Sequence, residues 1–216
     1  MDCIELDNLT RTYYDAQGET FCALDHASLI WEQGHSIAIM GESGSGKTTL
    51  AKILTGLEQP DSGEVFCRGE RVDRKNRKRN KNMHGKVRMI FQDPYSSLNP
   101  CMTINEMLTE TLRAKEKQIK FDQKERKKDR QRQIEQMLTR VGLSSLDGKR
   151  YPRELSGGQR QKAAIARALL LEPELLICDE AVSSLDAATR TQILDLLLRV
   201  VKEKKIACLF ISHDMA

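Results

Sequence analysis

Four short apolar runs along the chain, rich in β-branched or large aliphatic residues, predict buried strands. The runs are Ser36–Met40 and residues 87–91, 175–178 and 206–211. A residue suited to phosphate chemistry stands at or near the end of each run: Gly41, Gln92, Asp179 and His213. Because open parallel sheets bind ligands beyond the carboxyl ends of their strands, these four residues are expected to meet at one crevice.

Other periodicities predict the elements around this sheet. Helices are expected over residues 47–57, 159–171 and 188–204. Two further helices, near 104–119 and 122–141, lie in a region (about 95–155) without strand signal, which predicts an inserted helical lobe. Residues 4–6, 20–24 and 64–67 alternate like short antiparallel strands. No apolar run approaches the ~20 residues of a bilayer span, and the N-terminus does not have the pattern of a signal peptide.

The segment Gly-Glu-Ser-Gly-Ser-Gly-Lys-Thr fits the phosphate-loop pattern G-x-x-x-x-G-K-[ST], which ordinary residue frequencies produce by chance at a rate on the order of 1%. Its glycines let the backbone approach phosphate oxygens, and the following helix directs its positive end at them. Lys47 is predicted to neutralise the β- and γ-phosphates, and Thr48 to ligate Mg²⁺. The residues assigned to ATP are Gly41, Glu42, Ser43, Gly44, Ser45, Gly46, Lys47, Thr48 and Thr49.

Two further segments carry related chemistry. Asp179 ends a buried strand, where a carboxylate is unfavourable unless a cation or hydrogen bonds compensate, so it is predicted to hold Mg²⁺ directly or through water. Glu180 follows as the expected base that orients and activates the attacking water. Leu-Ser-Gly-Gly-Gln at residues 155–159 has the form of a helix N-terminus capped by Ser156, which is a second anion site.

Together these motifs resemble those of ABC (ATP-binding cassette) ATPases over nearly the whole chain. The resemblance implies an α/β fold: a P-loop NTPase (RecA-like) core with a mainly parallel sheet, an N-terminal antiparallel β subdomain and an inserted α-helical subdomain. It implies one ABC ATPase domain over residues 1–216. Residues 1–92 and 161–216 would form the nucleotide-binding core with the β subdomain, and residues 93–160 the helical signature subdomain.

The same resemblance implies an ATP-hydrolysing dimer with ATP and Mg²⁺ as its cofactors. In such dimers the signature segment of one subunit faces the γ-phosphate of ATP held by the other, and a D-loop containing Asp186 crosses the interface. The signature residues expected at this nucleotide are Ser156, Gly157, Gly158 and Gln159.

Three single residues also take roles from the resemblance. Gln92 is similar to the Q-loop glutamine, which contacts Mg²⁺ or the water and senses a transmembrane partner. His213 is similar to the switch histidine, which contacts the γ-phosphate and holds the water. Tyr13 matches the aromatic residue that stacks on adenine, although a shift of one residue would give this role to Tyr14. The expected catalytic residues are therefore Lys47, Gln92, Glu180 and His213, and the expected metal ligands Thr48, Gln92 and Asp179.

A narrower resemblance lies in residues 91–100, Phe-Gln-Asp-Pro-Tyr-Ser-Ser-Leu-Asn-Pro, which are similar to ATPases of bacterial dipeptide, oligopeptide and nickel importers. This implies a peripheral subunit on the cytoplasmic face of the cell membrane that powers import of peptides, nickel or a metal chelate. Its partners would be two polytopic permease subunits, a second ATPase subunit, identical or different, and indirectly an external substrate-binding protein. Between Gln92 and Asn99 such ATPases receive the permease's coupling helix. Ala181 departs from the proline usual in that subfamily.

The net charge of +4 is unevenly distributed, with a basic stretch over residues 68–86. Such a stretch either contacts nucleic acid or anionic lipid, or forms a solvated loop; we favour the solvated loop and expect no nucleic acid. The alternative is a soluble, non-transport ABC ATPase acting on nucleic acid or ribosomes. A regulatory cassette that binds ATP without turnover is a further alternative, against which Glu180 and His213 argue. The six cysteines form no C-x-x-C pair, which favours a reducing cytoplasm.

The chain stops three residues after His213, where such ATPases continue with further strands and helices. We therefore expect a truncated C-terminus, a last strand that lacks its sheet neighbour, and reduced stability from the uncovered sheet edge. Thermal melting against a chain extended with its natural downstream sequence tests this expectation, and equal melting would contradict it.

Overall fold

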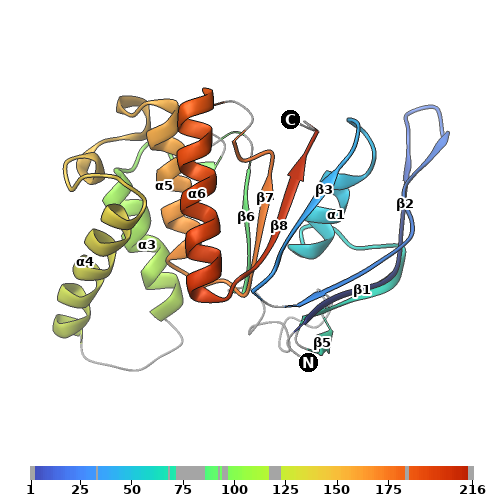
Figure 1. Ribbon diagram of the computed structural model, residues 1–216, viewed down its shortest axis with the longest axis horizontal. Helices are drawn as coiled ribbons and strands as arrows, with labels where there is room; N and C mark the ends of the chain where they lie inside the picture. Colours follow the sequence, from blue (N-terminus) through green and yellow to red (C-terminus); the bar gives the residue numbers. More distant parts are fainter. Residues whose placement is uncertain are drawn as a thin grey trace. The chain divides into compact units, whose positions relative to one another are not determined.

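The computed structural model of the chain describes residues 3–32, 34–67, 69–71, 86–91, 93, 97–116, 123–182 and 185–213 (Figure 1). The chain divides into two compact units. The first comprises residues 1–89, 174–180 and 198–216, and the second comprises residues 90–173 and 181–197.

The predicted parallel sheet is present in the order β3-β8-β7-β6. Its strands are β3 (Ser36–Met40), β6 (Val87–Ile90), β7 (Leu175–Asp179) and β8 (Ala207–Ser212). Strand β8 pairs in parallel with both β3 and β7. All five residues of β7 are buried, which explains why its sequence is a continuous apolar run without polar alternation.

The expectation that the last strand lacks a sheet neighbour is wrong. Strand β8 lies between β3 and β7, because the connection through α6 (Ala187–Lys204) returns the chain to the interior of the sheet. In the sheet as described, the outer strands are β3 and β6. The prediction that Ser36–Met40 is a buried strand is wrong: as an outer strand, β3 has only exposed and half-buried residues, and Met40 at its end is 56% exposed.

An antiparallel sheet of order β2-β1-β4-β5 belongs to the first unit, as predicted (Figure 1). Its strands are β1 (Cys3–Tyr14), β2 (Thr20–Glu32), β4 (Ser62–Cys67) and β5 (Glu70–Arg71). Strands β1 and β2 are both longer than the sequence pattern predicts. In β1, bulges after Leu6 interrupt the alternation of apolar and polar residues, so the pattern shows only the start of the strand. Asn8 has a positive φ of 50° there.

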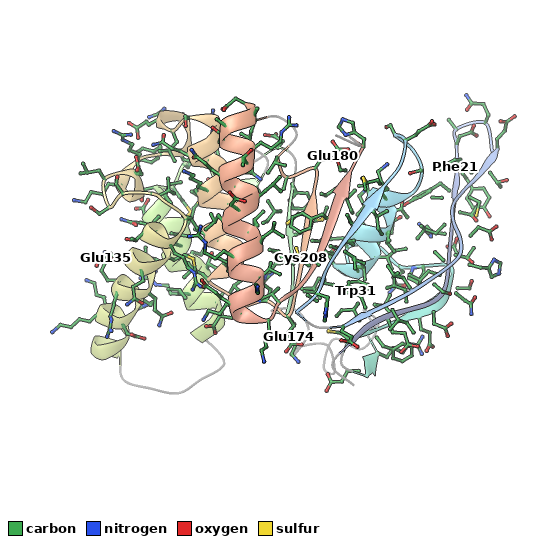
Figure 2. The ribbon with its side chains drawn as sticks, in the orientation of Figure 1. Phe21, Trp31, Glu135, Glu174, Glu180 and Cys208 are labelled. Carbon is green, nitrogen blue, oxygen red and sulfur yellow. The ribbon has the colours of Figure 1, made fainter. Side chains whose placement is uncertain are left out.

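Helix α1 (Lys47–Leu54) joins the two sheets into one core. Its apolar residues pack with the inner faces of both sheets, and Trp31 of β2, labelled in Figure 2, is buried in the same cluster. The cluster contains Ile4, Leu6, Leu9, Leu24, Trp31, Leu50, Ala51, Ile53, Leu54, Val65, Cys67, Leu175, Ile177, Ala207, Leu209 and Ile211. This burial fixes the start of α1 beside the carboxyl ends of the parallel strands.

The second unit contains the predicted inserted helical lobe. Its elements are α3 (Ile104–Glu116), α4 (Gln123–Arg140), the 3₁₀ turns η2 (Asp147–Lys149) and η3 (Pro152–Glu154), and α5 (Gly157–Leu169). Residues 187–197 of α6 also belong to it. Among the described helices, none combines the length and apolar character that crossing a membrane requires.

Candidate functional site

The phosphate-loop segment forms a tight turn between β3 and α1, and its glycines are required by backbone geometry. Gly44 and Gly46 have positive φ values of 84° and 87°. A Cβ at Gly46 would lie 2.0 Å from the carbonyl oxygen of Ala23, and one at Gly41 would lie 3.0 Å from Ser45 Oγ. Gly46 therefore has no room for a Cβ against β2, a Cβ at Gly41 would press on Ser45 within the loop, and Gly44 is required by its φ rather than by space.

Lys47, the first residue of α1, is buried, and its ammonium group lies against the loop. Its Nζ donates hydrogen bonds to the carbonyl oxygens of Gly41 (2.7 Å) and Glu42 (2.5 Å) and to Ser45 Oγ (3.2 Å). The first turn of α1 contains no acidic residue. A positive charge and a helix N-terminus thus converge on the same loop, which is an arrangement suited to phosphate.

The next residue connects the loop to β7. Thr48 Oγ1 donates a hydrogen bond to Asp179 Oδ2 at 3.3 Å, as expected if both bind one cation. Burial raises the pKa of the Asp179 carboxyl, and the neighbouring Glu180 raises it further, whereas Thr48 and Lys47 oppose the shift. A hydroxyl and a carboxylate in this position are hard oxygen ligands of the kind that Mg²⁺ prefers.

Glu180 has an unusual backbone conformation directly after β7. Its φ is +49°, which is uncommon for a residue other than glycine. Its N–H donates to the carbonyl oxygen of Ile211 in β8 (3.0 Å), and its Oε1 lies 2.9 Å from His213 Nδ1. Figure 2 shows Glu180 at the end of its strand. The ends of two adjacent parallel strands therefore bring together the carboxylate and the imidazole that the sequence predicts as catalytic.

Tyr13 lies close to α1, whereas its neighbour Tyr14 does not point into the core. Tyr13 Oη and Thr49 Oγ1 are 3.2 Å apart, and the Arg11 guanidinium lies 4.9 Å from the centroid of the Tyr13 ring. Glu58 and Asp61 hold Arg11 through ion pairs of 3.0 and 2.6 Å. Tyr14 is 76% exposed. Of the two tyrosines, the structure therefore favours Tyr13 for a base next to the phosphate loop.

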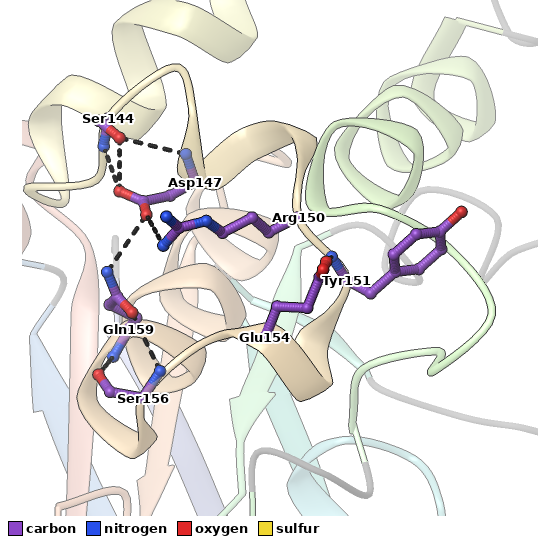
Figure 3. Close-up of polar contacts among 7 residues, drawn as sticks. All are labelled: Ser144, Asp147, Arg150, Tyr151, Glu154, Ser156 and Gln159. Carbon is purple, nitrogen blue, oxygen red and sulfur yellow. Dashed lines mark hydrogen bonds and ion pairs between the residues drawn. The ribbon is translucent and has the colours of Figure 1, made fainter.

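The signature segment is a capped helix start, as its sequence predicts (Figure 3). Ser156 Oγ accepts the N–H of Gln159 (3.2 Å), and Gln159 Oε1 accepts the N–H of Ser156 (3.0 Å), which forms a capping box at the start of α5. Ser156 and Gly157 are exposed. The Gln159 amide also donates to Asp147 Oδ1 at 3.2 Å, a contact that the sequence pattern did not reveal.

The two signature glycines have different surroundings. A Cβ at Gly158 would lie 2.6 Å from Thr189 Cγ2 of α6, whereas one at Gly157 would be in ordinary contact, 3.9 Å from Leu185 Cδ2. Asp186, predicted to contact nucleotide, caps α6: its Oδ1 accepts the Thr189 N–H at 3.0 Å. That bond lowers the pKa of the Asp186 carboxyl.

A groove of about 430 Å³ lies beside α3 in the second unit. It is lined by Ser97, Leu98, Asn99, Pro100, Met107, Glu110 and Arg167. Arg167 donates to the Ser97 carbonyl oxygen, and the Asn99 N–H points at Met107 Sδ (3.3 Å). These contacts hold the end of the importer-like segment against two helices of the lobe.

Two parts of the predicted site lie outside the described residues: Gln92, and residues 183–184, which belong with Asp186 to the expected D-loop. Most of the basic stretch 68–86 also lies outside them. Five cysteines in the described part of the chain are free thiols, at positions 22, 67, 101, 178 and 208. The described residues contain no cluster of three or more His, Cys, Asp or Glu side chains that could hold a metal.

Comparison with known proteins agrees with this geometry. The family model described as "ABC transporter" matches residues 24–183. The chain belongs to the ABC transporter family. As an ABC ATPase, it is similar to the "Oligopeptide transport ATP-binding protein OppF" of Bacillus subtilis, with 39% identity over 99% of this chain and 68% of the relative.

A second relative is the "Probable peptide ABC transporter ATP-binding protein y4tS" of Sinorhizobium fredii, 42% identical over 90% of this chain and 53% of its own length. This ABC ATPase thus spans about half to two thirds of the length of these two relatives. Solved structures agree on the fold. The cassette MJ0796 bound to ADP and Pi has a TM-score of 0.83 at 29% identity, covering 98% of this chain and 88% of that one. CbiO1 from Clostridium perfringens has a TM-score of 0.81 at 26% identity, covering 98% and 78%.

The residues present fit ATP and Mg²⁺. The glycine loop leaves a cradle that a Cβ at Gly41 would crowd, and Lys47 places a cation at that loop. Thr48 and Asp179 present neighbouring oxygen atoms to a cation. Sequence reasoning did not identify Arg11 or Asp147. Arg11 is two residues from Tyr13 in the same strand, and Ser144-Ser-Leu-Asp147 has the spacing of a local cap; these signals could have found both residues.

Proposed function

We propose that the chain hydrolyses ATP to drive an ABC importer of oligopeptides from the cytoplasmic face of the membrane. The observation that carries the catalytic part is the meeting of the loop residue Thr48 with Asp179, next to the Glu180–His213 pair. The importer part rests on relatives that are named oligopeptide transport ATP-binding proteins and match 99% of the chain.

In the proposed hydrolysis, residues of this chain position the reactants. Thr48 and Asp179 would hold Mg²⁺, which would neutralise negative charge on the phosphates. Lys47 would exchange its bonds to the loop carbonyls for phosphate oxygens, because a phosphate offers it full negative charges. Glu180 would orient the attacking water and accept its proton, and His213 would hold the Glu180 carboxylate in place.

We further propose that two ATPase subunits close head to tail over two ATP molecules. The N-terminus of α5 would meet the γ-phosphate of the other subunit's nucleotide, with Ser156 and Gly157 exposed for that contact. Asp186 would lie in the interface beside it, and Gln92 would complete the metal site. This arrangement would give the capped start of α5 an anionic ligand.

The groove beside α3 is the proposed docking position for a helix of the permease. Leu98 and Met107 line the groove but are buried, whereas the exposed side chains of Glu110 and Arg167 offer a negative and a positive charge to polar groups of such a helix. Two permease subunits and, indirectly, an external binding protein would complete the importer. Peptides are favoured over nickel or a metal chelate, because the relatives' names refer to peptides.

A pull-down from the native cells tests this proposal. The bait is the tagged full-length Glu180→Gln protein in mild detergent with ATP, and a Lys47→Ala variant serves as the control without phosphate binding. Recovery of two polytopic permeases with the ATP-bound bait supports the importer, and their binding protein then identifies the substrate as peptide, nickel or chelate. Recovery of ribosomes or nucleic acid without membrane proteins would overturn it in favour of the soluble alternative.

A further inference from the structure

Asp147 is the centre of a group of hydrogen bonds that ends at the signature segment (Figure 3). Its Oδ2 accepts from the N–H (2.9 Å) and the hydroxyl (2.6 Å) of Ser144. Its Oδ1 accepts from Arg150 Nη1 and from Gln159 Nε2, each at 3.2 Å. The side chain is buried, so these partners take the place of water.

The carboxylate determines which way the Gln159 amide faces. An ionised carboxylate only accepts hydrogen bonds, so Gln159 must direct its NH₂ group at Asp147 and its Oε1 at the Ser156 N–H. The bonds from Ser144 lower the pKa of Asp147, which keeps the group ionised. With the amide so oriented, Ser156 Oγ accepts the Gln159 N–H, and its own proton remains a donor for another acceptor.

The position of Asp147 is itself fixed by the helical lobe. Its neighbour Gly148 is so closely packed that a Cβ there would lie 2.5 Å from Asn105 Oδ1 of α3 and 2.9 Å from Leu138 Cδ1 of α4. The next turn also binds α3, because the Ile104 N–H donates to the Arg150 carbonyl oxygen at 3.0 Å. The packing of this turn against α3 and α4 thus fixes where Asp147 lies, and the hydrogen bond from Gln159 ties the start of α5 to it.

We propose that Asp147 is a positioning residue for the signature segment. It holds Gln159 so that Ser156 and the first N–H groups of α5 are aligned for the γ-phosphate of ATP in a second copy of the subunit. This inference rests on the proposed head-to-tail dimer and assigns the alignment of its signature half to one buried carboxylate. Asp147 belongs to the second unit, whereas the phosphate loop and Tyr13 belong to the first, so we expect the subunit's own loop to bind nucleotide without help from Asp147.

The test is an Asp147→Asn substitution in the Glu180→Gln background. Asparagine keeps the size of the side chain and can still accept from Ser144, but its NH₂ group would face the donors of Gln159 and Arg150. We expect the affinity of the monomer for a fluorescent ATP analogue to change less than about twofold. The dissociation constant of the ATP-dependent dimer, measured by analytical ultracentrifugation, should rise by about tenfold or more.

Ser144→Ala is the matched control. This substitution removes the hydroxyl that donates a hydrogen bond to the Asp147 carboxylate, but it leaves the bond between Gln159 and Asp147. It should therefore lower the melting temperature of the lobe without weakening the dimer. If Asp147→Asn does not fold, Gln159→Glu breaks the same bond from its other end, since a carboxylate still accepts from Ser156 but cannot donate to Asp147. Adding Asp147→Asn to that variant re-forms the bond with donor and acceptor exchanged, and dimerisation should recover.

The outcomes separate this inference from the function on which it rests. If the Glu180→Gln parent does not dimerise with ATP, the proposed function fails. If the parent dimerises and Asp147→Asn dimerises equally well, the positioning role is wrong and the proposed function stands. The inference is also wrong if Ser144→Ala weakens the dimer as much as Asp147→Asn, because the effect would then follow loss of lobe stability alone.

Discussion

His213 Nδ1 lies 2.9 Å from Glu180 Oε1, and the backbone of the same glutamate is bound to β8 through the Ile211 carbonyl oxygen. The side-chain pair with His213 and the backbone hydrogen bond to Ile211 thus set the direction of the Glu180 carboxylate. We expect His213→Ala to lower the turnover of ATP by about 10²-fold or more, because a general base out of position loses most of its contribution. ATP binding should weaken far less than turnover, because the phosphate loop and Lys47 still hold the nucleotide. The control is His35→Ala, whose exposed imidazole pairs only loosely with Glu32 at 3.8 Å; equal turnover in the two variants would contradict the assignment.

Tyr13 and Tyr14 offer a paired test of adenine recognition. Tyr13 contacts Thr49 beside the phosphate loop, whereas Tyr14 is exposed. Removing an aromatic ring that stacks on a base costs about 1–3 kcal/mol, so Tyr13→Ala should weaken ATP binding by about 5- to 150-fold. Tyr14→Ala should change it less than twofold. Isothermal titration with both variants decides between them, and the reverse order would assign the role to Tyr14.

Gly158 tests how closely the signature helix packs on α6. An added Cβ would meet Thr189 Cγ2 at 2.6 Å, so Gly158→Ala should lower the free energy of unfolding by about 1–3 kcal/mol. Thr189→Ser removes that methyl group and keeps the hydroxyl, and the double variant should regain most of the loss. Urea denaturation measures all three variants. Gly157→Ala, which meets only an ordinary contact, should leave stability within about 0.5 kcal/mol.

Substitutions at Gly46 and Gly44 distinguish two causes of lost stability in the phosphate loop, steric overlap and backbone strain. Both have positive φ, but only Gly46 approaches another backbone, the Ala23 carbonyl oxygen. Gly44→Ala should cost about 1–2 kcal/mol from conformation alone. Gly46→Ala should cost clearly more, because the chain must also move to admit the Cβ. Equal losses in thermal or urea unfolding would mean that the close approach to Ala23 is not a constraint.

Much of the fold was predictable because local sequence patterns mark where strands and helix caps lie. The strand Ser36–Met40 has the bounds of its apolar run, although its residues are exposed or half-buried rather than buried. The capping box of Ser156 and Gln159 follows from the spacing S-x-x-Q. The full length of β1 was not predictable, because its bulges after Leu6 break the alternation by which strands are recognised. The place of β8 in the sheet was also missed, since the apolar pattern does not specify strand order.

In the site, too, residues whose place follows from local sequence were predicted, and residues placed by tertiary packing were missed. The sequence predicted Lys47, Thr48, Asp179 and Glu180 because each stands at a strand end or helix start, where position along the chain fixes position in space. Asp147 was missed because its contact with Gln159 depends on two intervening 3₁₀ turns and on the packing of Gly148 against two helices. The spacing of Ser144 and Asp147 indicates a local cap, but the contact of Asp147 with Gln159 depends on tertiary packing and has no signal in the sequence.

The most direct test of the account compares the Glu180→Gln and wild-type proteins in two assays: steady-state release of phosphate from MgATP, and molecular mass by light scattering with and without ATP. We expect the substitution to lower turnover by about 10²-fold or more and to leave a dimer that forms only with ATP. A variant that retains most of the wild-type turnover would contradict the assignment of Glu180 as the catalytic base. A variant that binds ATP but stays monomeric would contradict the proposed ATP-bridged dimer.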